Sequence, residues 1–220
     1  MEKDEIIAML RNAILNCDID EAKNAAKAAL EANIDPVEAI ENGLAPGIRE
    51  VGERFERSEV FLPHLVLAAD AMAEAAKILQ SAMSQGDMAK VKKGTVVMAT
   101  VEGDLHDLGK NLVSVMLRAA GFEVYDLGRD VPTDTIISKA LEVNADIIGL
   151  SSLMSTTRPY QRELIEELKR RGLRERFKVM VGGGTVYKQW AEEIGADGYG
   201  YNASEAVQKA LELMSQKIPK

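Results

Sequence analysis

In residues 1–92, apolar side chains recur at intervals of three and four positions, the spacing of one face of a helix. The two clearest series begin at Ile6 and at Val66, and they comprise Ile6, Met9, Leu10, Ala13 and Ile14, then Val66, Ala69, Met72, Ala73 and Ala76. Alanine, leucine, glutamate and lysine, all good helix formers, are frequent here. The pattern predicts amphipathic helices packed on one another.

Start signals divide this half into four helices. Asp18 or Asp20 can cap a second helix that runs to about Asn33, and Asp35-Pro36 is an N-cap followed by proline at the first helical position. A fourth helix starts near residue 59 or 63. Turns this short favour an antiparallel four-helix bundle. We expect Gly43, Pro46 and Gly47 to interrupt the third helix.

From residue 94 onward, short β-branched runs alternate with helical patterns. The expected strands are 95–101, 123–127, 146–150, 178–181 and 198–201, and the expected helices are 108–120, 133–143, 158–171, 188–194 and 204–214. Repeated βα units predict an α/β fold, a flavodoxin-like or Rossmann-like five-stranded parallel sheet with helices on both faces. Such sheets bind ligands beyond the carboxyl ends of their strands, so the loops after the first, third and fourth strands are the candidates.

Composition changes between the two halves. Residues 1–92 contain 4 of the 17 glycines and 10 basic against 17 acidic residues, whereas the rest has 13 glycines and 17 basic against 18 acidic residues. We therefore expect a helical domain over residues 1–88 and an α/β domain over residues 94–220, joined by a polar linker at residues 84–94.

Charge and cysteine content exclude several classes. The net charge of −8 argues against a general nucleic-acid binder. Cys17 is the one cysteine, so neither an intrachain disulfide nor a zinc cluster is possible, which favours a reducing compartment. No run approaches the ~18 apolar residues of a membrane span, and the acidic start does not resemble a signal peptide. We expect a cytoplasmic protein with no nucleic-acid or membrane partner.

The loop after the first strand contains one of the two histidines of the chain. Asp104 stands two residues before His106 and can accept a hydrogen bond from its Nδ1, which leaves Nε2 free as a metal ligand or a base. Gly109 removes a side chain where the loop enters the helix, so a flat ligand could approach the backbone. A His near an Asp more often caps a helix or lies in a core. If His106 binds a metal, a cofactor must supply the remaining ligands, because one histidine is too few.

Hydroxyls follow the third strand and glycines follow the fourth. The first run is Ser151, Ser152, Leu153, Met154, Ser155, Thr156 and Thr157, with more hydroxyls than one helix cap requires. The second is Gly182-Gly183-Gly184, which indicates a sharp turn or a large group lying against the backbone. It matches neither the dinucleotide fingerprint nor the P-loop.

These motifs together resemble a known family. The set Asp104-x-His106-x-x-Gly109, Ser151-x-Leu153 and Gly182-Gly183 follows a helical domain that contains Phe-Leu-Pro-His at residues 61–64. It is similar to the cobalamin-binding module of methionine synthase, and most similar to the small corrinoid proteins of methylamine and methanol methyltransferase systems. The resemblance covers nearly the whole chain.

The resemblance implies a corrinoid, cobalamin or methylcobalamin, with His106 as the lower ligand of cobalt and the helical half above the cofactor. Asp104 would hydrogen-bond His106, Thr157 would close a relay to Asp104, and the glycines would line a slot for the nucleotide tail. The implied cofactor-binding residues are Asp104, His106, Gly109, Ser151, Leu153, Ser155, Thr157, Gly182 and Gly183, with His106 as the metal ligand.

The implied function is that of a methyl carrier, not itself an enzyme. It would accept a methyl group on cobalt(I) from a substrate-specific methyltransferase, with a methylated amine favoured as the donor. It would then pass the group from methyl-cobalt(III) to a second methyltransferase that acts on a thiol or tetrahydrofolate, and a reductive activase would restore oxidised cobalt. We interpret Cys17 as a plain thiol and His64 as a solvated or capping residue.

Three alternatives remain. A cobalamin-sensing regulatory module needs a DNA-binding domain for which the chain has no room. The small subunit of an adenosylcobalamin mutase shares the Asp-x-His-x-x-Gly loop but normally lacks the helical cap. A receiver domain needs paired carboxylates at the end of the first strand, for which only Asp104 and Asp107 are available.

Overall fold

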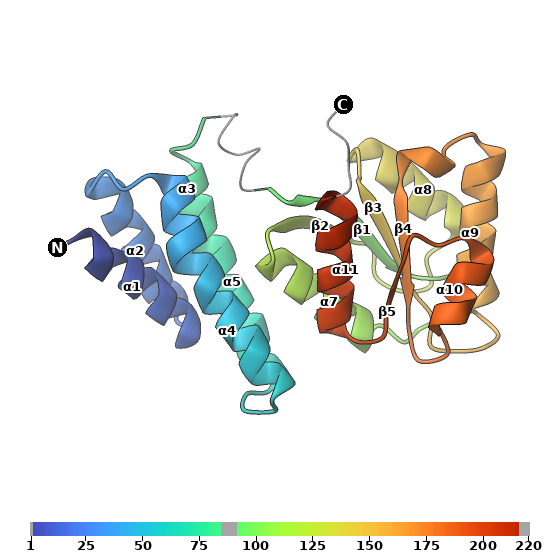
Figure 1. Cartoon of the computed structure of the whole chain (residues 1–220), viewed down its shortest axis with the longest axis horizontal. Coiled ribbons are helices and arrows are strands. Elements are labelled where there is room, and N and C mark those ends of the chain that lie inside the picture. Colours follow the sequence, from blue (N-terminus) through green and yellow to red (C-terminus); the bar gives the residue numbers. More distant parts are fainter. Residues whose placement is uncertain (1, 85–91, 216–220) are drawn as a thin grey trace. The chain divides into compact units, whose positions relative to one another are not determined.

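The computed structural model describes residues 2–84 and 92–215. It divides into two compact units, shown in Figure 1. One comprises Met1–Lys93 together with Arg118–Gly121, and the other comprises Gly94–Leu117 together with Phe122–Lys220. Most of the expected linker at 84–94 lies outside the described residues, so the expected domain limits stay a prediction.

The first unit is a helical bundle. Its α-helices are α1 (Lys3–Leu15), α2 (Ile19–Glu31), α3 (Pro36–Ala39), α4 (Ala45–Glu56) and α5 (Leu62–Gln80). Asp18 caps α2 by accepting the Glu21 N–H at 2.9 Å, and Asp35 caps α3 through the Val37 N–H at 2.9 Å. Both caps satisfy a backbone donor that the first helical turn leaves without a partner.

Small side chains line the contact between α2 and α5. The fully buried alanines on these helices are Ala22, Ala25, Ala26 and Ala29 on α2, and Ala68, Ala71 and Ala75 on α5. Because an alanine projects only a methyl group, the two helices can pack closely along this stripe. The first apolar series predicted from the sequence is confirmed, because α1 buries Ile6, Leu10, Ala13 and Ile14. The second series is wrong in phase: of its members only Met72 is buried and Ala73 is exposed, whereas the buried face of α5 consists of Leu65, Ala68, Ala71, Met72, Ala75 and Leu79.

The expected interruption of the third helix is wrong. Between α3 and α4 the chain continues as one turn of π-helix, η1 (Ile40–Leu44), in which the Ala45 N–H bonds to the Ile40 carbonyl. A Cβ at Gly43 would lie 2.9 Å from Leu10 Cβ, and one at Gly47 would lie 2.9 Å from Ile14 Cβ. These glycines therefore allow the helix to pack closely on α1 instead of ending it. A π turn inside an α-helix accommodates an extra residue without a break.

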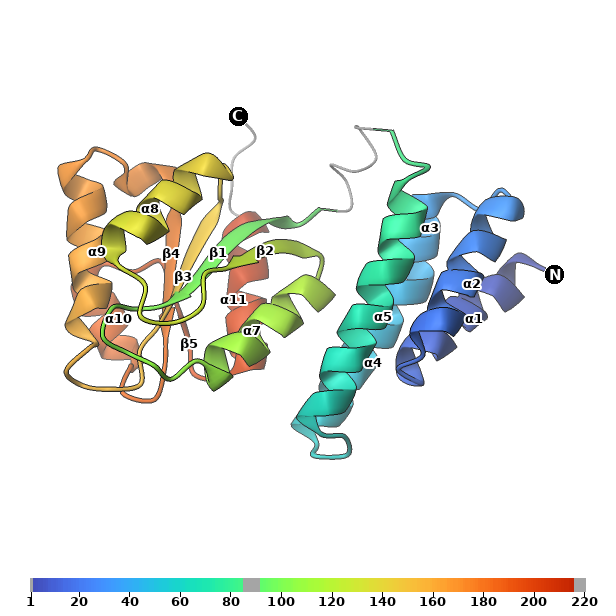
Figure 2. The same cartoon turned by 180° about the vertical axis from the view of Figure 1, so that it is seen from behind.

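The second unit is a parallel α/β sheet (Figure 2). Its strands are β1 (Gly94–Thr100), β2 (Phe122–Asp126), β3 (Ile147–Ser151), β4 (Lys178–Gly182) and β5 (Gly198–Gly200), in the order β2-β1-β3-β4-β5. Its helices are α7 (Leu108–Ala119), α8 (Thr133–Glu142), α9 (Pro159–Arg170), a short 3-10 turn η2 (Arg174–Arg176), α10 (Lys188–Ile194) and α11 (Ala203–Ser215). The α/β fold class and the strand and helix sequence predicted for this half are confirmed.

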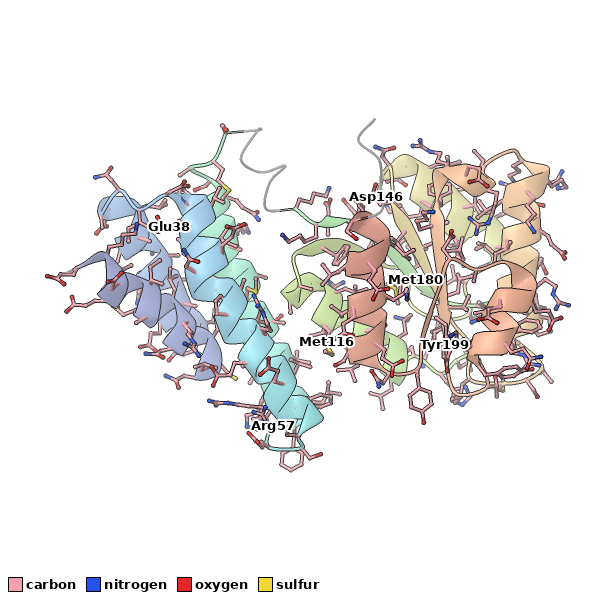
Figure 3. All side chains as sticks on the ribbon, viewed as in Figure 1. Glu38, Arg57, Met116, Asp146, Met180 and Tyr199 are labelled. Carbon is pink, nitrogen blue, oxygen red and sulfur yellow. The ribbon has the colours of Figure 1, made fainter. Side chains whose placement is uncertain are left out.

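Helices cover both faces of the sheet. One face packs against α8, α9 and α10 through a core that includes Val97, Ile148, Val179, Ile165 and Trp190. Right-handed crossovers place α7 on the opposite face, because β1 to β2 runs in the reverse direction to the later connections. In Figure 3, Asp146 marks the amino edge of the sheet, Met180 its middle and Tyr199 the half nearer the carboxyl edge.

The strand order creates a switch point between β1 and β3. These neighbours pair in parallel, with Thr100 opposite Ser151 at their carboxyl ends. The chain leaves β1 toward β2 on one side and leaves β3 toward β4 on the other. The two loops diverge there, which is where ligands bind in open α/β sheets.

Candidate functional site

Asp104 and His106 form a hydrogen-bonded pair in the loop after β1. The ring Nδ1 of His106 lies 2.8 Å from Asp104 Oδ1, and the His106 backbone N–H donates to the same oxygen at 3.0 Å. Asp104 is fully buried, whereas the His106 side chain is 53% exposed. The structure thus contains the predicted pairing, with the carboxylate inside and the imidazole at the surface.

The second carboxylate oxygen of Asp104 binds the loop after β3. It accepts the backbone N–H of Leu153 at 2.7 Å, the backbone N–H of Met154 at 3.2 Å and the hydroxyl of Thr157 at 2.8 Å. Burial raises the pKa of Asp104, but the hydrogen bonds from His106, Thr157 and Leu153 outweigh burial and bring the pKa well below its usual value. Asp104 is therefore an anion at neutral pH and only accepts hydrogen bonds.

The proton positions on the histidine follow from that charge. Because Asp104 cannot donate, the hydrogen between Oδ1 and Nδ1 belongs to His106. A neutral imidazole with its hydrogen on Nδ1 has a lone pair on Nε2. Among the described residues, no hydrogen bond to Nε2 occurs. His106 consequently has one nitrogen available as a ligand, Nε2, on a side chain that is 53% exposed.

Ser152 extends the hydrogen-bond chain, and the sequence analysis did not select it. Its Oγ lies 2.9 Å from Thr157 Oγ1. Since Thr157 donates its single hydrogen to Asp104, we assign Ser152 as the donor to Thr157; the Met154 carbonyl, at 3.2 Å, is a second acceptor for the same hydroxyl. Ser151 does not take part through its side chain; its carbonyl accepts the Val101 N–H at 3.1 Å.

A signal for Ser152 was present in the sequence. In the strand that ends at residue 151, Ile148 and Leu150 face the core shared with α8–α10. Ser152 lies two residues after Leu150, so it belongs to the same face of the strand, and it is fully buried. Extending the two-residue alternation of buried side chains from Ile148 and Leu150 to position 152 would have predicted a buried hydroxyl here.

The glycines at the carboxyl end of β4 allow close packing within the chain itself. A Cβ at Gly183 would lie 2.0 Å from the Ser152 carbonyl oxygen, and Gly183 has a φ of +119°. At Gly182 the nearest atom to such a Cβ would be the Gly200 oxygen at 3.1 Å. Only glycine at position 183 allows the loop after β3 to pack this closely, and this requirement holds without any bound cofactor. The predicted slot for a nucleotide tail stays a prediction.

The rim of the site is apolar and open. Leu105, Leu108 and Leu153 are 60%, 71% and 43% exposed. Leu105 and Leu153 belong to the two loops that meet at the Asp104 carboxylate, and Leu108 is the first residue of α7. A Cβ on Gly109 would meet no atom within 4 Å. Exposed leucines beside a lone ligand nitrogen match a flat, largely apolar group with a metal at its centre.

Within the described residues, no three His, Cys, Asp or Glu side chains gather as a metal site. His106 can therefore hold a metal there only together with ligands from a cofactor, as the sequence analysis required. The described side chains fit a corrinoid, which brings its own equatorial nitrogens. Ser155 is exposed in the same loop and makes no described hydrogen bond to the Asp104 pair.

The helical unit contains the other histidine and the cysteine. His64 Nδ1 accepts the Phe61 backbone N–H at 3.4 Å, at the start of α5, so its capping role is confirmed. The thiol of Cys17 donates to the His64 carbonyl at 3.2 Å. Burial raises the pKa of Cys17, which agrees with the interpretation of a plain thiol.

Fold and site define a cobalamin-binding α/β module preceded by a helical domain. Two family models, each described as a B12 binding domain, match residues 94–208 and 6–80. Dimethylamine corrinoid protein 1 of Methanosarcina acetivorans is 52% identical over 215 residues, which is 98% of this chain and 100% of that protein. Trimethylamine corrinoid protein 1 of the same organism is 47% identical over 96% of this chain and 98% of its own length.

A solved structure agrees with these relatives. The methanol:cobalamin methyltransferase complex from Methanosarcina barkeri contains a chain that is 31% identical, with a TM-score of 0.84, over 98% of this chain and 82% of that one. The chain belongs to the family of B12-binding corrinoid proteins, and its cofactor is a corrinoid. No helix in the described part of the chain is long and apolar enough to cross a membrane.

Proposed function

We propose that this chain is the methyl-carrying corrinoid protein of a dimethylamine-dependent methyltransferase system. The donor is assigned from the relatives named for dimethylamine, which match over the full length of the chain. This assignment also favours the methyl-carrier interpretation over a mutase subunit, for which we expected no helical domain. The match to the helical unit at residues 6–80 is the relevant observation.

The observation that carries the proposal is that both carboxylate oxygens of Asp104 accept hydrogen bonds, one of them from His106, while Nε2 of His106 has no hydrogen-bond partner among the described residues. Asp104 keeps a hydrogen on Nδ1, and Thr157 and Ser152 keep the carboxylate in place. His106 would be the residue that holds the cobalt, and the exposed leucines Leu105, Leu108 and Leu153 would supply apolar contacts to the cofactor. When bound, the corrinoid supplies a metal that can accept and release a methyl group.

We assign the catalytic steps to partner proteins. A methyltransferase would activate the methylated amine, and a second methyltransferase would bind the acceptor thiol or tetrahydrofolate. A reductive activase would repair accidental oxidation. In this arrangement the chain is a carrier subunit and not a catalyst on its own. The 31% identical chain in a methanol:cobalamin methyltransferase complex supports a direct contact with a methyltransferase.

Ligation is tested by reconstituting the full chain with a corrinoid and recording the visible and electron paramagnetic resonance spectra. We expect the spectrum of base-off, histidine-ligated cobalt in the wild type. His106→Ala should lose it, while His64→Ala, the matched control at the other histidine, should retain it. Retention of the signature in His106→Ala would overturn the ligand assignment.

Donor choice is tested by methyl transfer to the reconstituted protein. Methyltransferases specific for dimethylamine, trimethylamine, monomethylamine and methanol are supplied one at a time with their donors. We expect the dimethylamine pair to methylate the protein at least about tenfold faster than the others. A higher rate with methanol would contradict the assignment of an amine donor.

A further inference from the structure

Lys110 is an unusual member of the core. It lies in the first turn of α7, four positions after His106, and it is 2% exposed with its side chain fully buried. A buried ammonium group is costly unless it is paired and hydrogen-bonded. We therefore expect the ammonium group of Lys110 to be held by specific ion-pair and hydrogen-bond partners.

Asp126, the last residue of β2, supplies the pairing. Lys110 Nζ donates to Asp126 Oδ1 and, at 2.6 Å, to Asn111 Oδ1. The other oxygen of Asp126 accepts the Ser114 hydroxyl at 2.6 Å, and Oδ1 also accepts the Gly128 N–H at 2.9 Å. We call Lys110, Ser114, Asp126 and Gly128 the Asp126 cluster. It joins α7 to the end of β2 and to the loop that follows.

The loop after β2 is hydrogen-bonded to the end of β1 and to the histidine loop. Thr100 N–H donates to the Gly128 carbonyl at 3.0 Å. Gly103 N–H donates to Asp130 Oδ1 at 2.7 Å, and Asp130 N–H donates to the Asp104 carbonyl at 3.0 Å. Residues 100–104 are thus attached to a segment whose start is fixed by Asp126.

The far end of the histidine loop is attached to the same cluster through the helix. Asn111 N–H donates to the Asp107 carbonyl at 2.8 Å, which fixes the loop to the first turn of α7. Lys110 and Ser114 occupy that part of the helix and both bind Asp126. The cluster therefore holds both ends of the loop that contains Asp104 and His106, and it does so without touching His106.

We propose that Lys110 and Asp126 are positioning residues that set where His106 stands at the carboxyl edge, and thereby how readily it ligates cobalt. The ligation part rests on the proposed function, whereas the positioning part concerns the protein alone. A neutral or shorter side chain at position 110 would release the start of α7 from β2. The loop would then sample other positions, and Nε2 would be displaced from the place that the fold gives it.

A matched control exists at the opposite edge of the sheet. Arg174 Nη2 lies 2.8 Å from Asp197 Oδ2, with side chains 16% and 17% exposed, and Asp197 also accepts the Val179 N–H at 2.8 Å. This pair joins the residues that precede β4 and β5, away from the histidine loop. Lys110→Met and Arg174→Met each remove one cation from a well-shielded ion pair, although Asp197 keeps Lys178 Nζ at 3.4 Å. The comparison therefore depends on which amides exchange faster in each variant and not on the total loss of stability.

The first measurement uses the cofactor-free full chain. Amide hydrogen exchange is followed at Gly103 and His106, with Val179 as the reference at the control pair. We expect Lys110→Met to accelerate exchange at Gly103 and His106 by roughly tenfold or more and to leave Val179 within about twofold. Arg174→Met should show the reverse pattern. Equal acceleration at all three amides in Lys110→Met would overturn the proposal.

The second measurement uses the reconstituted chain. We expect a smaller histidine-ligated fraction in Lys110→Met, at saturating corrinoid, and an unchanged fraction in Arg174→Met. A milder variant, Ser114→Ala, keeps the ion pair and covers the case in which Lys110→Met does not fold; it should shift both readouts in the same direction by less. An unchanged ligated fraction and unchanged exchange in Ser114→Ala would count against the proposal.

The two proposals fail in different ways. If wild-type protein shows no histidine ligation, the proposed site is wrong, but exchange at Gly103 and His106 still tests the positioning role. If ligation is present and Lys110→Met changes neither exchange nor the ligated fraction, only the positioning role is wrong.

Discussion

Thr157 Oγ1 donates to Asp104 Oδ2 across 2.8 Å, although the two residues are 53 positions apart in the chain. The bond crosses the point where the connections from β1 and β3 diverge. Leu153 and Met154 add backbone N–H donors to the same oxygen. Asp104 therefore fastens the two loops together and fixes the hydrogen on His106 with its other oxygen.

The hydroxyl of Thr157 should matter more than its methyl group. Thr157→Val keeps the shape but leaves Asp104 with one donor fewer and leaves the Ser152 hydroxyl only the Met154 carbonyl, at 3.2 Å, as an acceptor. We therefore expect a loss of about 1–3 kcal/mol in the free energy of unfolding. Thr157→Ser should stay close to wild type. Urea denaturation of both variants measures the difference. A larger loss in Thr157→Ser than in Thr157→Val would indicate that the methyl group, and not the hydrogen bond, is what the site requires.

Asp104→Asn tests the charge of the carboxylate. The amide has one oxygen and an NH₂ group, so either His106 or the Leu153 N–H loses its acceptor. We expect the protein still to bind corrinoid, with a shifted cobalt(II)/cobalt(I) midpoint potential, because a negative partner of the ligand has been removed. Potentiometric titration of variant and wild type measures the shift. Identical potentials would contradict the role of Asp104 in tuning the ligand.

Local pattern predicted the second unit well because each βα repeat is coded by neighbouring residues. The strand runs and helix runs lie close to their expected ranges, and Asp104 and His106 are near enough in sequence for their bond to be foreseen. Lys110 was missed although it shares the buried face of α7 with Ser114 and Leu117, at helical spacing. A lysine in that series was a visible signal of a buried ion pair.

The rest depended on contacts between distant segments. Gly43 and Gly47 look like helix breakers in sequence, but their place against Leu10 and Ile14 is set by how α1 crosses the third helix. The need for glycine at position 183 likewise arises from the Ser152 backbone, 31 residues earlier by numbering. Neither close approach can be predicted from the residues that neighbour these glycines in the sequence.

Gly183 and Gly184 should differ sharply in their tolerance of alanine. At Gly183 the added Cβ meets backbone atoms of Ser152 and the φ of +119° is unfavourable, so we expect Gly183→Ala to lose at least about 1–3 kcal/mol. At Gly184 the Cβ meets only Leu153 Cδ1, the end of an exposed side chain that can rotate away. Gly184→Ala should therefore change stability little, and chemical denaturation of both variants compares them.

This difference also decides how the tail slot can be tested. A large side chain at Gly183 would disturb Ser152 and hence Thr157, so loss of corrinoid there would not identify a slot. Gly182→Ala is the better probe, because its Cβ would lie 3.1 Å from the Gly200 carbonyl oxygen, a tight contact that a shift of a few tenths of an ångström relieves, whereas at Gly183 the Cβ would lie 2.0 Å from the Ser152 oxygen. Weaker corrinoid binding with unchanged stability would support the slot, whereas unchanged binding would count against it.

Asp126 should make stability depend on acid pH. Burial raises its pKa, but the hydrogen bonds from Lys110, Ser114 and Gly128 outweigh burial and lower the pKa below the usual value. In the unfolded chain an aspartate has a pKa of about 3.9. Above that value the contribution of Asp126 to stability is complete. As pH falls from there toward the folded pKa, the unfolded state takes up the proton first, and the contribution is lost.

The comparison is between wild type and Lys110→Met/Asp126→Asn, which neutralises the pair without leaving one buried charge alone. Urea denaturation is measured from pH 7 down to the lowest pH at which both proteins fold. Asp104 also has a lowered pKa, but it is present in both proteins and cancels in the difference. We expect the wild type to lose stability more steeply below about pH 4, by up to about 1.4 kcal/mol per pH unit for one proton. Parallel curves would mean that Asp126 has the same proton affinity folded and unfolded, and that its bonds to Lys110 and Ser114 contribute no net stabilisation of the charged form.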